Sequence, residues 1–87
     1  MKVYVVGEEG VEHSFIYSVH KSKKGALKAW NDIRISLLEH AKSCIRESSE
    51  DNDMFETIVK NLSCTDPEKL NNGVQDAPFL KEYTLQD

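Results

Sequence analysis

Both ends of this chain carry the alternating pattern of β-strands, and the stretch between them carries the periodicity of a helix. Near the N-terminus "KVYVV" is rich in β-branched and aromatic residues, and "EHSFIYSVH" and the C-terminal "FLKEYTLQ" alternate along their length. From Ala26 to Cys44, apolar residues recur every three or four positions instead. Strands at both chain ends favour an α+β fold of two layers, in which helices cover one face of a three-stranded sheet.

The predicted order is strand, strand, helix, helix, short helix, strand, with the two longer helices forming a hairpin over the sheet. A single domain, 1–87, is expected because a chain of 87 residues is too short to build two cores. The first two strands form a hairpin, and Gly7 and Gly10 in "GEEGVE" supply the positive φ of a tight turn. The pattern does not determine which strand the last one joins. A place beside the first, parallel or antiparallel, is favoured, since the second strand leads directly into the long helix.

Alternation also predicts which side chains share a face. In the second strand it places Phe15, Tyr17 and Val19 on one face, and Ser14, Ile16 and Ser18 on the other. In the last strand it places Phe79, Tyr83 and Leu85 on the side of Lys81.

The long helix is predicted over about 22–47. Ser22 follows the second strand, and its hydroxyl can accept from the free amides of the next turn, so Ser22 is the expected N-cap. The apolar stripe comprises Ala26, Trp30, Ile33, Leu37, Ala41 and Cys44. Ile35 falls off this stripe and is expected at the surface.

A second, shorter helix is predicted after the acidic segment "ESSEDND". Asp53 and Glu56 have the spacing of a capping box, and Met54, Phe55, Ile58, Val59 and Leu62 then form the apolar stripe. A third helix of one or two turns starts at Thr65 or Asp66 and ends at Gly73.

The charge of the chain favours a protein as its partner. With 15 acidic and 11 basic residues the net charge is −4 at pH 7, so nucleic acid is repelled and no direct nucleic-acid binding is expected. Acids gather at the bend between the two helices: Glu47, Glu50, Asp51, Asp53 and Glu56. We expect this acidic bend to face a basic surface on a partner, with Arg34 and Ile35 as secondary contacts on the exposed side of the long helix.

The start of the long helix is the alternative candidate site. Helix N-termini present unpaired amides, and Lys21, Lys23 and Lys24 surround Ser22 and Gly25 with positive charge. These residues favour a small anion or nucleotide, with Trp30 or Tyr17 as a stacking wall. The glycine-rich spacing of a P-loop is absent, and a plain solvated corner is the simpler interpretation.

No metal or cofactor is expected. His40 and Cys44 lie four residues apart on a helix, but further ligands would have to come from Cys64 and from His13 or His20. Structural zinc usually shows paired ligands in sequence, so two reduced, packed cysteines are the simpler interpretation.

The sequence predicts a protein that is not an enzyme and lies in the cytoplasm. No nucleophile has a visible base and orienting partner, and so short a chain leaves little room for a substrate pocket of several hundred Å³. No apolar run is long enough to span a membrane, and "MKVYVVGEEG" lacks the pattern of a secretory signal.

The segments "MKVYVV", "FIYSVHKSKKGALKAW" and "PFLKEYTLQD" together resemble small α/β proteins encoded by bacteriophages and bacteria. The resemblance covers the first forty or so residues and the last ten, and it assigns no functional residue. It implies a short accessory protein that binds and blocks a host factor, such as an anti-CRISPR or anti-restriction inhibitor. The sequence therefore predicts a non-catalytic protein-binding module, with anion or nucleotide binding as the alternative; a homodimer through a sheet edge is compatible with both.

Overall fold

The computed structural model describes residues 1–10, 14–47, 53–70 and 77–86. Its elements follow in the order β1 (Lys2–Glu9), β2 (Ser14–His20), α1 (Lys23–Glu47), α2 (Asp53–Leu62) and β3 (Ala77–Thr84). The three strands form one sheet in the order β2-β1-β3, and β1 is antiparallel to both neighbours. The α+β fold and the pairing of the last strand with the first are therefore confirmed, and the orientation is antiparallel.

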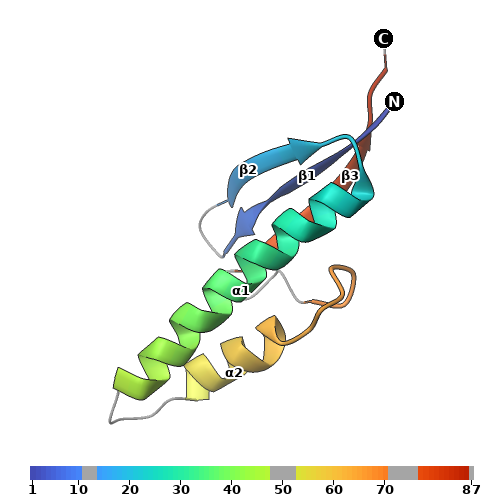
Figure 1. Ribbon diagram of the computed structural model, residues 1–87. Coiled ribbons are helices and arrows are strands. Elements are labelled where there is room, and N and C mark those ends of the chain that lie inside the picture. Colours follow the sequence, from blue (N-terminus) through green and yellow to red (C-terminus); the bar gives the residue numbers. More distant parts are fainter. Residues whose placement is uncertain (11–13, 48–52, 71–76, 87) are drawn as a thin grey trace.

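One helix provides most of the cover of the sheet. α1 runs diagonally across one face, and α2 packs beside the far half of α1, beyond the strands (Figure 1). The helical hairpin is confirmed, but its second helix lies on the first rather than on the sheet. The core between the layers consists of Val6, Ala26, Trp30, Leu62, Leu70 and Ala77. Trp30 fixes the two layers, because its indole N–H donates to the carbonyl oxygen of Pro78 in β3 at 3.2 Å.

A β-bulge changes the second strand. Val6 pairs with Ser18 and Gly7 with Ile16, so Tyr17 has no partner residue in β1. The prediction that Phe15 and Val19 share a face is wrong, because the extra residue places Phe15 opposite Glu8 and Val19 opposite Val5, two β1 positions on opposite faces.

The glycines of the hairpin do not have the predicted positive φ, and Gly7 has another role. Gly7 lies inside β1, and neither Gly7 nor Gly10 has a positive φ. A Cβ on Gly7 would overlap the carbonyl oxygen of Phe15 and lie 2.7 Å from Cζ of Phe79. Gly7 is therefore needed for close packing rather than for a turn.

The segment predicted as a short helix is a single turn. Residues 67–69 form this turn, in which the amides of Lys69 and Leu70 donate to the carbonyl of Asp66. The Asp66 carboxylate accepts from the amide of Glu68 at 3.0 Å, so Asp66 does cap the turn, as an Asx-turn does. Gly73, the predicted end of the helix, lies outside the described residues.

Candidate functional sites

The sheet has one face that α1 does not cover. Tyr4, Val6 and Leu80 pack against the core under α1. Successive residues of a strand point to opposite faces, so Val3 and Val5 of β1 point away from the helix. We call this second face the open face.

Three large apolar side chains are exposed on the open face. Ile16, Val19 and Tyr83 pair with Gly7, Val5 and Val3, which are the open-face positions of β1. Their exposed fractions are 68%, 60% and 50%. Large apolar side chains that are exposed together on one face typically mark an interaction site.

Phe79 and Lys81 of β3 lie on the open face, beside Gly7 and Val5 of the central strand. Phe79 is buried, yet it is not part of the core cluster under α1, because its ring lies across Gly7 on the other side. The Lys81 ammonium lies 4.8 Å from the centre of that ring and 3.6 Å from the carboxylate of Glu9. The open face thus has one buried aromatic ring, three exposed apolar side chains and one pair of opposite charges.

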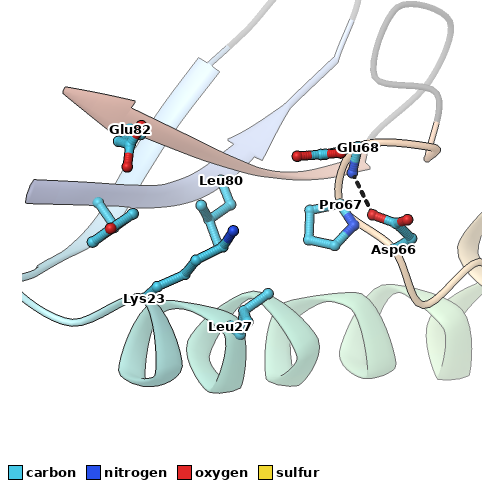
Figure 2. Close-up of a pocket in the computed structure, with 8 residues that line it drawn as sticks. Lys23, Leu27, Asp66, Pro67, Glu68, Leu80 and Glu82 are labelled. Atoms are coloured by element: carbon cyan, nitrogen blue, oxygen red, sulfur yellow. Dashed lines mark hydrogen bonds between the residues drawn. The ribbon is translucent and has the colours of Figure 1, made fainter.

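A pocket of about 540 Å³ lies between the sheet, the start of α1 and the turn at 66–68, and we call it the β3 pocket (Figure 2). Its volume falls within the roughly 300–1,000 Å³ of typical ligand sites. The expectation that the chain has little room for such a pocket is therefore wrong. Tyr4, Leu27, Pro67 and Leu80 form its apolar walls, and Lys23, Asp66, Glu68 and Glu82 are its charged residues.

Negative charge dominates the β3 pocket. Three carboxylates line it against one ammonium group, and Glu82 also pairs with Lys2 at 3.6 Å. Glu68 comes from the turn and Lys23 from α1, from which it reaches toward the sheet (Figure 2). Its lining holds neither histidine, cysteine nor serine among the described residues, and so offers no nucleophile with a neighbouring base.

The lysine-rich start of α1 is solvated. Ser22 caps the helix as predicted, since its hydroxyl accepts from the Gly25 amide at 3.1 Å. Lys21, Lys23 and Lys24 are all exposed. Of these, Lys23 lines the β3 pocket among carboxylates, which makes the site less favourable for an anion.

The proposed stacking wall for a nucleotide is not available at Trp30. The Trp30 side chain is only 1% exposed and lies in the core. Tyr17 is exposed and donates a hydrogen bond from its phenol to the carboxylate of Glu8 at 3.0 Å. That hydrogen bond and the negative charge of Glu8 raise the pKa of Tyr17 above its ordinary value.

Arg34 is buried, so its prediction as an exposed contact residue is wrong. Only 8% of the residue is exposed, and one guanidinium nitrogen donates to the carbonyl oxygen of Leu62 at 2.7 Å. Its other contacts are to Asn31 Oδ1, at 2.9 and 2.8 Å, and to the Trp30 ring, whose centre lies 6.0 Å away. Leu62 ends α2, where carbonyl groups lack helical partners, so Arg34 ties the end of α2 to α1.

The acidic bend lies mostly outside the described residues. Glu50 and Asp51 belong to the segment 48–52, and Glu47 and Asp53 are the terminal residues of α1 and α2. Glu56 is exposed on α2, and Ile35 is exposed on α1 as predicted. That the acidic bend is a contact surface therefore stays a prediction.

The possible metal ligands do not gather in the described part of the chain. His40 Nε2 lies 3.8 Å from Cys44 Sγ, while the Cys64 thiol faces the carbonyl oxygen of Asp66 at 3.6 Å. Both cysteines are free. Among the described residues, no three potential ligands lie close enough together to hold a metal ion; His13 is not among them.

Comparisons with family models, curated proteins and solved structures found no match to this chain. Within the described ranges, neither helix combines the length and apolar character of a membrane span.

Neither the open face nor the β3 pocket was predicted from the sequence. One signal for the open face was present in "FIYSV", where apolar residues occupy both alternating sets of positions. A strand with only one buried face needs apolar residues in only one of the two sets. The pocket has no such signal, because its lining comes from β1, α1, the turn at 66–68 and β3.

Proposed function

We propose that this chain is a non-catalytic protein-binding module that contacts its partner through the open face. The observation that supports it is the exposure of Ile16, Val19 and Tyr83 on the face opposite α1. Covering apolar surface contributes about 25 cal/mol per Å², and aromatic side chains such as Tyr83 are enriched among the residues that dominate binding. The Lys81 and Glu9 pair at this face gives the partner a charge pattern to match.

The more specific hypothesis, a phage-encoded inhibitor of a host protein, depends on the sequence resemblance and stays a prediction. For a protein of this kind a bacterial lysate is the appropriate source of partners. The acidic bend is the competing contact surface. Variants of the acidic bend and of the open face distinguish the two surfaces.

The test is capture from a bacterial lysate by the immobilised chain and by two variants. Ile16→Lys places a charge in the open face, whereas the triple variant with Glu50, Asp51 and Asp53 changed to lysine reverses the acidic bend. We expect the triple variant to retain the proteins that the unmodified chain captures and Ile16→Lys to lose them. If only the triple variant loses the captured proteins, the contact surface is the acidic bend and not the open face.

The alternative function, anion or nucleotide binding at the start of α1, is tested by thermal shift. A ligand at one hundred times its Kd would stabilise the fold by about 2.7 kcal/mol. We expect no shift with phosphate or a panel of nucleotides, because Ser22 already accepts from the helix end and carboxylates lie beside Lys23. A shift that Lys24→Glu abolishes would establish the alternative.

A further inference from the structure

We propose that the outer edge of β3 binds an extended basic segment of a partner protein, which adds a strand to the sheet and places a lysine or arginine side chain in the β3 pocket. This inference shares with the proposed function only the assumption of a protein partner. It concerns a different surface and is tested with a defined peptide.

The edge of β3 is suited to strand addition. In the described sheet β2 and β3 are the outer strands, and an outer strand presents backbone N–H and C=O groups to a further strand. β3 pairs with β1 without a register shift from Lys2↔Thr84 to Glu9↔Ala77, whereas the bulge at Tyr17 interrupts β2. Pro78 has no N–H, so the segment from Phe79 to Thr84 is the part of β3 that can template a new strand.

The β3 pocket lies where alternate side chains of an added strand would fall. Leu80 and Glu82 line the pocket from the helix side of β3. Side chains directly opposite on neighbouring strands have Cβ atoms about 4.5–5.5 Å apart, and diagonal neighbours are within reach of long side chains. The residues of the added strand beside Leu80 and Glu82, on the helix side, therefore lie next to the pocket.

The walls of the β3 pocket match the two parts of a long basic side chain. Leu27, Pro67 and Leu80 can cover an aliphatic stem, and the carboxylates of Glu68 and Glu82 can meet the charged end. Three carboxylates face Lys23 and, through its pair with Glu82, Lys2, which leaves an excess of one negative charge that a cation would neutralise and an acidic side chain would increase.

A second copy of this chain fits the edge less well. On the helix side its own β3 would present Leu80, Glu82 and Thr84, which include an acid and no base. Pairing two copies through β3 would thus bring a further acid, and no further cation, to each pocket. The charge favours a partner of different sequence.

The experiment measures binding of a fluorescein-labelled peptide in which valine alternates with arginine, by anisotropy at low salt. We expect Glu68→Lys to raise the Kd about tenfold, or about 1.4 kcal/mol, and Lys23→Gln to lower it. Glu39→Lys is the matched control, because it makes the same charge change at an exposed position of α1 outside the pocket. Equal Kd values for Glu68→Lys and Glu39→Lys would refute the pocket.

Two further peptides test the remaining parts of the proposal. A peptide with glutamate in place of arginine should bind at least tenfold more weakly, and a fully N-methylated arginine peptide should lose binding because it has no backbone donors. Retained binding of the N-methylated peptide would refute strand addition. The open-face variant Ile16→Lys should bind the arginine peptide like the unmodified chain, so this result and the lysate experiment can fail independently.

Discussion

The two faces of the sheet use neighbouring positions of the same strands, yet they have different fates. Val6 of β1 is completely buried under α1. Val19 of β2, which pairs with the neighbouring Val5, is largely exposed on the open face. The face under α1 gains free energy of folding from its burial. Most of the apolar surface of the open face is not buried within a single chain and adds no such free energy. In the proposed function a partner covers it.

The largest effect expected under α1 is that of Trp30→Ala. Its side chain fills the core and bonds to Pro78, so truncation should cost about 3–5 kcal/mol, which approaches the whole stability of a small domain. Circular dichroism during urea unfolding measures it. Ile35→Ala, on the exposed side of the same helix, is the control and should stay within about 0.5 kcal/mol of the unmodified chain. If both variants unfold at a similar urea concentration, Trp30 does not hold α1 on the sheet in the way the structure indicates.

Arg34→Ala should have the next largest effect, about 2–3 kcal/mol, because it leaves the carbonyl of Leu62 without its buried donor. Arg34→Lys keeps a charge but not the geometry that reaches both Leu62 and Asn31, so we expect an intermediate loss. Chemical denaturation gives both values. If Arg34→Ala unfolds at the urea concentration of the unmodified chain, Arg34 does not stabilise the pairing of α1 with α2.

Gly7→Ala tests whether packing on the open face adds to stability at its centre. The new methyl group would press on the backbone of Phe15 and on the Phe79 ring, at a cost of about 1–3 kcal/mol. Phe79→Leu combined with Gly7→Ala should recover part of this loss, since the two side chains compete for the same space. Strictly additive losses in the double variant would show that the Phe79 ring does not lie across Gly7.

The smallest effect is a pH dependence at Tyr17 on β2. Because Glu8 raises the pKa of Tyr17, the stability from this contact is present below the ordinary tyrosine pKa and is lost as pH rises through the raised value. Titration of the Tyr17 ring by NMR should give a lower pKa in Glu8→Gln than in the unmodified chain. Glu9→Gln changes the neighbouring acid and should leave the Tyr17 titration unchanged. A Tyr17 pKa that does not fall in Glu8→Gln would disprove the contact.

The amino-acid sequence by itself determined the strands, the two long helices, their order and the cap at Ser22. These features depend on the spacing of apolar residues and on side chains within a few positions, so the information is local. Chain order also favoured the pairing of β3 with β1, because β2 leads directly into α1, but it left the direction of the strand open.

Tertiary structure alone decided the rest. The bulge at Tyr17 depends on how β2 pairs with β1, and it moved Ile16 and Val19 onto one face against the sequence alternation. Arg34 is buried because Leu62, 28 residues away, offers a carbonyl at the end of α2. The β3 pocket exists only where four separate segments meet. Periodicity reports which residues neighbour one another along an element, but contacts between distant segments set which of its faces remains open to a partner.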